Sequence, residues 1–259
     1  MEKQTVLISG GASGIGRRIA ERFLEQGALV HICDASQDHI DEFLGANPGA
    51  SATLADIGDR TAVDTVFAAH ALHHDGLDLL INNAGVAGPV GPVESLDEDA
   101  WDKCLQINLS GTFYMTRRAI PLLRKSSAAS IINIASTAGL LGCPNRSPYV
   151  ASKWAQVGLT KTWAMELGPE GIRVNAVCPT SVDGPRIDSV IEHEAEQRGT
   201  STDAVREVYL RQTSLRSFAT ADEVADTVLF LASEKASRIS GQSLSVDGHT
   251  EGFLNWLDQ

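Results

Sequence analysis

The stretch T-V-L-I-S-G-G-A-S-G-I-G, residues 5–16, decides the fold. Its first part, 5–9, is a short apolar run of strand length, and a glycine-rich turn follows at once. A helical pattern then runs from Ile15 to Gln26, and A-L-V-H-I-C-D at 28–34 has the character of a second strand. Strand, glycine turn, helix and strand in this order predict a βαβ unit.

Gly10, Gly14 and Gly16 allow the turn to be tight and the backbone to come close to a ligand. The N-terminus of the helix that follows offers free N–H groups and a dipole that favours an anion such as a pyrophosphate. A glycine-rich sequence also occurs in ordinary tight turns. Because this one stands between a strand and a helix, and an acid ends the next strand, we interpret it as a dinucleotide site.

Asp34 refines the choice of dinucleotide. A carboxylate at the end of the second strand can bind both hydroxyls of a ribose, and it repels a 2′-phosphate. Ala35 and Ser36 follow, so no base stands next to Asp34 to accept that phosphate. Asp is also common at strand ends for purely structural reasons, but in this context we predict NAD rather than NADP as the cofactor.

Strands and helices continue to alternate along the chain. We expect further strands at 51–54, 77–82, 131–136, 172–177 and 243–246, and helices at 59–74, 96–124, 148–167 and 222–232. This order predicts an α/β protein with a single-domain Rossmann fold over 1–259, whose doubly wound parallel sheet of about seven strands has helices on both faces. Ligands of such sheets bind beyond the carboxyl ends of the strands. The polar or glycine residues at those ends are Gly10, Asp34, Asp56, Asn83, Ser136 and, with them, Pro179.

Two segments depart from a plain alternation. The helix at 148–167 carries apolar residues nearly all round, which predicts burial on two sides, with the sheet on one and a second subunit on the other. Residues 184–217 are polar and charged and follow a strand end, which is where a substrate lid would lie. A solvated surface excursion is the alternative for 184–217.

Composition limits the possible partners. The 259 residues carry a formal net charge of −12, which disfavours nucleic acid and anionic membranes as partners. The four cysteines are scattered without a C-x-x-C pair, so neither disulfides nor a cysteine zinc site are expected, and a cytoplasmic location is predicted. We expect no membrane-spanning segment and no cationic, apolar leader.

Tyr149 and Lys153 are four residues apart, so on a helix they share a face. A cation beside a phenol favours the phenolate, and such a phenol can take a proton from an alcohol or return one to a carbonyl. Ser136 ends a strand and offers a hydroxyl for the same oxygen. Alone, Y-x-x-x-K is more often an exposed helical pair, so the surrounding motifs decide its interpretation.

Those motifs together resemble the short-chain dehydrogenase/reductase family over nearly the whole chain. The matching stretches are S-G-G-A-S-G-I-G (9–16), N-N-A-G (82–85), I-N-L-S-G (107–111), N-I-A-S-T-A-G (133–139), Y-V-A-S-K (149–153), R-V-N-A-V-C-P (173–179) and S-G-Q-S-L-S-V-D-G (240–248). The resemblance implies an oxidoreductase that interconverts a secondary alcohol and a ketone with NAD(H), assembled as a homotetramer through helices near 97–124 and 148–168.

The resemblance also implies roles for particular residues. Tyr149 would be the acid/base, Lys153 would assist it and bind the nicotinamide ribose, Ser136 would hold the substrate oxygen, and Asn108 would anchor a water that links Lys153 to solvent. The implied contacts of the cofactor are Gly10, Ser13, Gly14, Ile15, Gly16, Asp34, Asp56, Ile57, Asn83, Ala84, Gly85, Tyr149, Lys153, Pro179 and Val182. Two departures from the family pattern, Thr180 and Gly184, fall beside the expected nicotinamide.

The substrate pocket is expected from 86–89, 137–145 and the lid, with Val86, Leu140 and Leu141 as apolar contacts and Arg146 and Arg186 available for an acidic group. The sequence leaves the substrate open among polyols, sugars, cyclic ketones, hydroxy acids, acyl thioesters and steroids. A non-catalytic dinucleotide sensor is one alternative function.

A metal hydrolase is another alternative, because His70, His73 and His74 could share a helical face. An exposed, polar helix end explains these histidines better, so no metal site is predicted.

Overall fold

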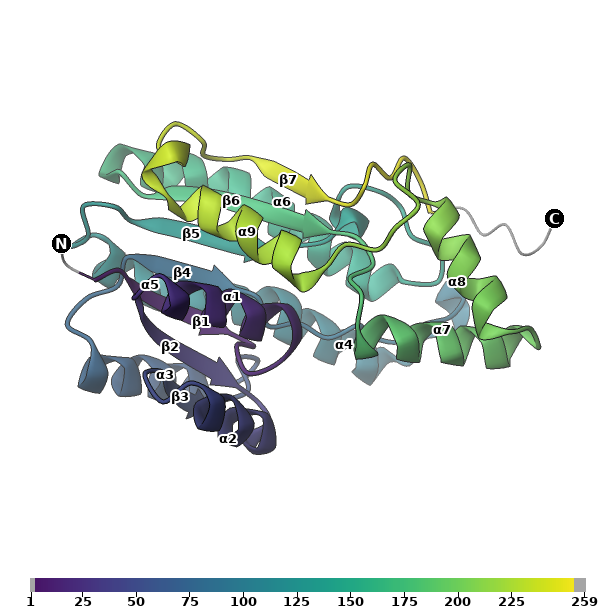
Figure 1. Cartoon of the computed structure of the whole chain (residues 1–259), viewed down its shortest axis with the longest axis horizontal. Helices are drawn as coiled ribbons and strands as arrows, with labels where there is room; N and C mark the ends of the chain where they lie inside the picture. Colours follow the sequence, from purple (N-terminus) through teal and green to yellow (C-terminus); the bar gives the residue numbers. More distant parts are fainter. Residues whose placement is uncertain (1–2, 254–259) are drawn as a thin grey trace.

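Seven parallel strands form one sheet through the middle of the computed structural model, which describes residues 3–253 (Figure 1). The strand order is β3-β2-β1-β4-β5-β6-β7, and every neighbouring pair is parallel. The strands are β1 Thr5–Ser9, β2 Leu29–Asp34, β3 Ser51–Leu54, β4 Leu79–Asn82, β5 Ser130–Ile134, β6 Arg173–Pro179 and β7 Ser243–Val246. The predicted α/β fold with a doubly wound parallel sheet is confirmed.

The chain winds outward in one direction from β1 to β3 and in the other from β4 to β7. The direction reverses between β1 and β4, which are hydrogen-bonded neighbours with Ser9 opposite Asn82. The loops that leave the carboxyl ends of these two strands must therefore diverge, and a crevice opens between them. This topology places the glycine turn after β1 and the N-N-A-G segment after β4 on the two sides of one crevice.

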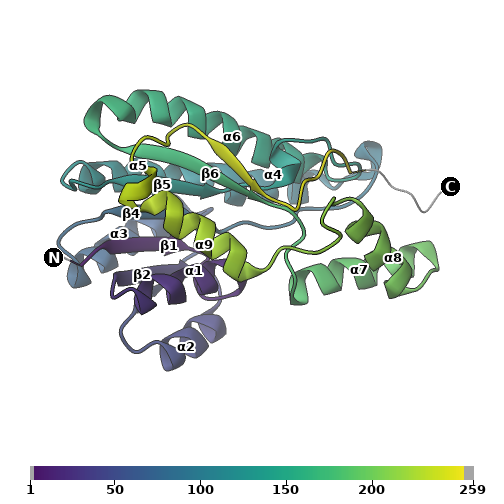
Figure 2. The ribbon, with the colours of Figure 1, turned by 45° about the horizontal axis from the view of Figure 1, so that its top comes forward.

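Helices cover both faces of the sheet (Figures 1 and 2). One core cluster joins the sheet to α1 (Gly14–Glu25), α2 (Gln37–Ala46) and α9 (Ala221–Ala232). On the opposite face, a second cluster joins it to α3 (Arg60–His73), α5 (Thr112–Leu123) and α6 (Ser147–Leu167). Strands β1, β4 and β5 are buried along their whole length, as expected of central strands that are covered on both sides.

The predicted helix at 96–124 is continuous but not uniform. It comprises α4 (Glu98–Leu105), a π-helical turn (Gln106–Gly111) and α5, and the Asp97 side chain caps its start by accepting a hydrogen bond from the N–H of Ala100 at 2.7 Å. The predicted insertion at 184–217 contains α7 (Pro185–Arg198) and α8 (Thr202–Arg211), which pack on each other through a small apolar cluster of their own.

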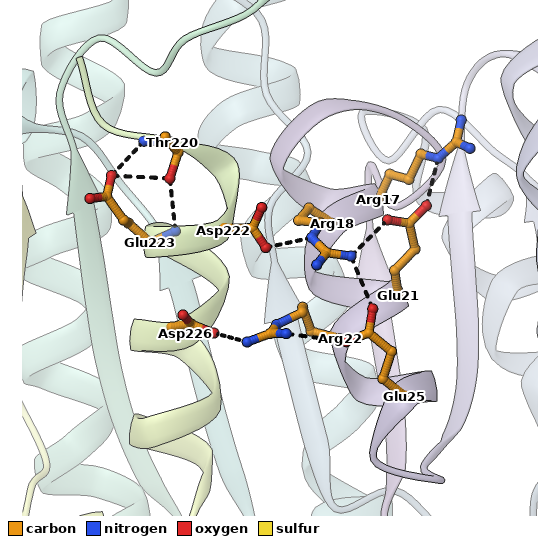
Figure 3. Close-up of polar contacts among 9 residues, drawn as sticks. All are labelled: Arg17, Arg18, Glu21, Arg22, Glu25, Thr220, Asp222, Glu223 and Asp226. Atoms are coloured by element: carbon orange, nitrogen blue, oxygen red, sulfur yellow. Dashed lines mark hydrogen bonds and ion pairs between the residues drawn. The ribbon is translucent and has the colours of Figure 1, made fainter. Parts of the chain in front are cut away.

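Helices α1 and α9 lie side by side although about two hundred residues separate them in the sequence (Figures 1 and 3). Arg18 donates to Asp222 at 2.7 Å and Arg22 donates to Asp226, so each ion pair joins the two helices (Figure 3). A capping box of Thr220 and Glu223 begins α9 (Figure 3). Because partly exposed ion pairs are screened by water, apolar contacts such as Phe23 carry the stability and the ion pairs fix the pairing.

Within residues 3–253 no helix is both long enough and apolar enough to cross a bilayer.

Candidate active site

A cavity of about 1240 Å³ opens beyond the carboxyl ends of the strands. It exceeds the usual size of a small-ligand pocket, which is roughly 300–1,000 Å³, and so has room for a dinucleotide together with a substrate. Most of the residues that the sequence singled out line it: Gly10, Ser13, Gly14, Ile15, Asp34, Asp56, Ile57, Asn83, Ala84, Gly85, Ser136, Tyr149, Lys153, Pro179 and Val182. The other two predicted residues, Gly16 and Asn108, are buried behind the wall.

The glycine turn forms one end of the cavity. Gly10 has φ 62° and its N–H donates to the carbonyl of Cys33 at 2.7 Å, which ties the turn to β2. A Cβ on Gly16 would lie 2.0 Å from the Gly10 carbonyl oxygen, so any side chain there would force the turn open. Ser13 precedes α1 without a side-chain cap, and the first turn holds no acid. The first N–H groups of α1 therefore remain available for an anion.

Asp34 is fixed beside this turn by two backbone donors. One carboxylate oxygen accepts from the N–H of Ala12 at 3.1 Å and the other from the N–H of Ser36 at 3.1 Å. The carboxylate is thus oriented before any ligand arrives, and it lines the same cavity as the glycine turn. An oriented acceptor suits ribose hydroxyls, which donate, and opposes a 2′-phosphate.

Ser9 and Asn83 tie the two sides of the crevice together. The Ser9 hydroxyl accepts from the N–H groups of Asn83 at 3.1 Å and Ala84 at 3.2 Å. In return, the Asn83 side-chain amide donates to the carbonyls of Ser9 at 3.2 Å and Gly10 at 2.8 Å. The N-N-A-G segment therefore holds the glycine turn in its shape, a use of Ser9 and Asn83 that the spacing of the motifs did not reveal.

Tyr149 and Lys153 lie on α6 and line the cavity. The Lys153 ammonium is 5.7 Å from the centre of the Tyr149 ring, and the Arg146 guanidinium carbon is 5.2 Å from it. Ser136 follows β5 and caps a short 3₁₀ turn, where its hydroxyl accepts from the N–H of Ala138 at 3.1 Å. All three side chains reach the same cavity, as their placement at strand and helix ends predicts.

Lys153 is buried, with 4% of its surface exposed. Its Nζ donates to the carbonyl of Ile134 at 2.8 Å and to Oε1 of Gln156 at 2.9 Å. Burial, and secondarily the charge of Arg186, lowers the pKa of Lys153 to about 7. Its charge is therefore sensitive to whatever enters the cavity, since an anion beside it favours the ammonium form.

Gln156 is a residue that the sequence analysis missed. Its Oε1 accepts from Lys153, and its Nε2 donates to the backbone carbonyl of Asn108 at 2.9 Å and to the Thr112 hydroxyl at 2.9 Å. The Gln156 side chain thus joins the Lys153 ammonium to the Asn108 carbonyl, which lies in the π-helical turn. A water that Asn108 anchors to link Lys153 to solvent stays a prediction.

The side chain of Asn108 has a second task. Its Oδ1 accepts from the N–H of Val86 at 2.8 Å, and its Nδ2 donates to the carbonyl of Val86 at 3.0 Å and to the Ser152 hydroxyl at 3.1 Å. The side chain therefore fixes the loop after β4 while the backbone of the same residue holds Gln156. Asn108 is a positioning residue in this geometry, and it does not reach the cavity.

The far side of the cavity is lined by α7 and α8 together with residues 143–146. Val86, Arg146 and Arg186 line it, as predicted. The prediction for Leu140 and Leu141 was wrong: neither lines the cavity, and Leu140 packs instead against the cluster around Ala135 and Val157. Tyr209 was missed, and it lines the cavity with its hydroxyl donating to Glu194 at 2.8 Å. Closure of 184–217 over bound ligands stays a prediction.

The histidines near the end of α3 are not all exposed, contrary to the prediction from the sequence. His73 is exposed, but His70 is buried at 1% exposure and contacts the ring of His31, so the prediction of an exposed helix end was wrong for His70. They lie at the amino-terminal edge of the sheet, away from the cavity, as expected.

The sheet is doubly wound, the N-terminus of α1 has N–H groups available for an anion, and a buried lysine lies beside a tyrosine. These features together define a nucleotide-binding enzyme of the Rossmann class. The chain belongs to the short-chain dehydrogenase/reductase family, a family of oxidoreductases, since a family model described as enoyl-(acyl carrier protein) reductase matches residues 10–249.

Relatives of known activity match over almost the full chain. Trans-4-hydroxycyclohexanecarboxylate dehydrogenase of Sinomonas cyclohexanicum is 37% identical over 95% of this chain and 92% of its own. D-beta-hydroxybutyrate dehydrogenase of Rhizobium meliloti is 36% identical over 95% of this chain and 97% of its own. The crystal structure of NAD⁺-bound xylitol dehydrogenase is 26% identical with a TM-score of 0.90, over 95% of this chain and 98% of that one.

The pKa of Lys153 predicts a pH-dependent stability. Its pKa is about 7 in the folded protein and 10.5 in the ordinary lysine, so between these values the unfolded chain binds a proton that the native protein lacks. Native stability must therefore rise with pH through this window. The free energy of unfolding of the wild type, relative to Lys153→Met, should increase by up to about 1.4 kcal/mol per pH unit from pH 7 to 10. Urea unfolding at several pH values measures it. A difference that stays constant with pH would show that Lys153 keeps its ordinary pKa.

Proposed function

We propose that this protein is an NAD(H)-dependent oxidoreductase that interconverts a secondary alcohol and a ketone. The observation that carries the proposal is the buried chain of contacts from Tyr149 to Lys153, Gln156 and Asn108, at the wall of a cavity whose other end is the glycine turn. Such a reaction needs a general acid/base and a binding site for the cofactor's pyrophosphate in the same cavity. A non-catalytic sensor has no use for the costly burial of a lysine.

The residues divide the work between them. Tyr149 takes the proton from the substrate hydroxyl during oxidation and returns it to the oxygen during reduction. Ser136 holds the same oxygen by a hydrogen bond, so that the carbon to be oxidised faces the cofactor site. Bound NAD supplies the hydride acceptor at its nicotinamide. Lys153 supplies a cation beside Tyr149, 5.7 Å from the centre of its ring, and its hydrogen bonds to Ile134 and Gln156 hold the ammonium in place.

The cofactor site fits a dinucleotide on its own geometry. The N-terminus of α1 and the open turn at Gly14, where a Cβ would meet no atom within 4 Å, leave room for a pyrophosphate. Asp34 would hold a ribose, and Asp56, Ile57 and Asn83 line the wall beside it. The family relationship to an NAD⁺-bound dehydrogenase supports the same assignment.

Asp34 should determine the choice between NAD and NADP. Asp34→Ala removes both the acceptor for the ribose hydroxyls and the charge that repels a 2′-phosphate. We expect NAD to bind roughly tenfold or more weakly, and NADP more tightly than it binds the wild type. Titrations of both cofactors by intrinsic fluorescence measure this, with Asp38→Ala on the exposed face of α2 as the control. A wild type that prefers NADP would contradict this role of Asp34.

Tyr149→Phe keeps the ring and removes only the oxygen that moves the proton. We expect NAD to bind with unchanged affinity while kcat falls by at least the roughly 100-fold that general acid–base catalysis contributes. Tyr114→Phe is the matched control, because Tyr114 lies on α5 and does not line the cavity. Near-normal turnover by Tyr149→Phe on alcohols that the wild type oxidises would refute the mechanism.

We also propose that the protein assembles as a homotetramer through the helices at 97–124 and 148–168. Large apolar side chains on these helices are exposed in the single chain, namely Phe113 at 43%, Trp154 at 50% and Met165 at 80%. Light scattering at micromolar concentration should give the mass of four chains for the wild type and a smaller mass for Phe113→Lys combined with Met165→Lys. Leu72→Lys on α3 is the control, since Leu72 is 84% exposed and lies outside these two helices. A monomeric wild type would rule the assembly out.

A further inference from the structure

Three histidines meet at the amino-terminal edge of the sheet, the edge opposite the cavity. His31 lies near the start of β2, His70 lies in the last turn of α3, and His74 follows the end of that helix. One ring nitrogen from each can be chosen so that all three lie within 4.8 Å of one another. Three imidazoles from β2 and the end of α3 converge here, and none of them is paired with a carboxylate of residues 3–253.

The side chain of His70 has one nitrogen available to bind a metal ion. Its Nε2 lies 3.0 Å from the carbonyl oxygen of Gly76. A carbonyl oxygen only accepts, so Nε2 carries the proton and Nδ1 carries the lone pair. That Nδ1 is buried and has no hydrogen-bond partner among residues 3–253. A second-shell carbonyl that fixes the tautomer of a histidine is the usual arrangement behind a metal-binding imidazole.

His74 and His31 complete the set. The Nδ1 of His74 is also buried without a partner among the described residues, and its Nε2 lies 3.4 Å from the hydroxyl of Ser51. The ring of His31 stands between the hydroxyls of Ser51 at 2.7 Å and Thr53 at 2.9 Å. Because a hydroxyl donates or accepts by rotation, either nitrogen of His31 can be released while the other stays bonded.

The rings are held in the neutral form that binds metals. Burial, and secondarily the neighbouring rings, lowers the pKa of His31 to about 3 and that of His74 to about 4, and burial lowers the pKa of His70 as well. A neutral imidazole carries one nitrogen lone pair that can bind a metal ion. In a core of histidines that served packing alone, buried nitrogens would have hydrogen-bond partners, and two of these nitrogens have none.

We propose that His31, His70 and His74 bind one transition-metal ion of the zinc type. A tetrahedral zinc ion with bonds of about 2.0–2.1 Å places its nitrogen ligands about 3.4 Å apart. The ring nitrogens lie within 4.8 Å of one another, so metal binding must draw them together by up to about 1.4 Å. Half-exposed His74 gives the ion a route from solvent, and a water or the Ser51 hydroxyl completes the coordination. The ion joins β2 to the end of α3. The site lies away from Tyr149, so its role is structural.

No metal site was predicted from the sequence, because His70, His73 and His74 stand on one predicted helix and the sequence does not place His31 beside them. The ligand set becomes visible only when the fold brings His31 from β2 to α3. His73 is the neighbour that does not belong to the set: it is exposed, although its ring centre is 6.1 Å from that of His31. This pair of adjacent residues, His73 outside and His74 inside, provides a matched comparison.

The test uses the full chain without a histidine tag, treated with a chelator and then titrated with ZnCl₂ by calorimetry. We expect one zinc ion per chain and a rise in Tm of roughly 5–10 °C at a free zinc concentration a hundred times the Kd. CoCl₂ should give the intense visible absorption of a four-coordinate ion. A chain that binds no zinc, or whose Tm does not rise, would overturn the proposal.

Variants locate the ion. His74→Ala should weaken zinc binding at least tenfold and remove the rise in Tm, whereas His73→Ala should behave as the wild type. His70→Gln is the second ligand variant, and the circular dichroism spectrum of each variant verifies that it is folded. Zinc binding that survives in both His74→Ala and His70→Gln would place the ion elsewhere. Equal loss in His73→Ala would show that the three residues named are not the site.

Discussion

The burial of one positive charge, that of Lys153, is the constraint on which the rest of the site depends. An ammonium group inside a protein is costly unless its hydrogen-bond donors are satisfied. Two acceptors bind the Lys153 ammonium: the carbonyl of Ile134 at the end of β5 and the side-chain amide oxygen of Gln156. Gln156 in turn needs an acceptor, which the π-helical turn supplies at Asn108. The π-helical turn and the buried lysine of the neighbouring helix are thus linked through Gln156.

The sequence allowed the fold to be predicted because the signals are local. A glycine turn between a strand and a helix, and an acid at the next strand end, indicate a βαβ unit without any knowledge of distant residues. The placement of Asp34, Ser136, Tyr149 and Lys153 around one cavity followed from topology, since parallel strands bring their carboxyl ends to one edge. Leu140 was misplaced for the opposite reason: whether a side chain after a strand turns to the cavity or the core depends on packing.

Contacts between segments far apart in the chain could not be predicted from local sequence patterns. Nothing in Y-V-A-S-K indicates that Gln156, three residues later, bridges two helices. The burial of His70 was missed because His31 stands on another element, and a helical pattern alone shows only which residues share a face. Strand β2 therefore has two uses: Asp34 ends it at the cavity, and His31 lies near its start, at the edge where we propose a metal.

The central claim is that a hydride passes directly between a secondary alcohol and the nicotinamide of NAD in this cavity. Arg146 and Arg186 line it, so the alcohols tested should include hydroxy acids and their neutral counterparts. Each alcohol would carry deuterium on its hydroxyl-bearing carbon, and the cofactor product would be analysed by NMR. The account predicts that, for any alcohol oxidised, deuterium appears at C4 of the nicotinamide, on one face only. Oxidation that leaves C4 without deuterium, or that releases the deuterium to water, would contradict it.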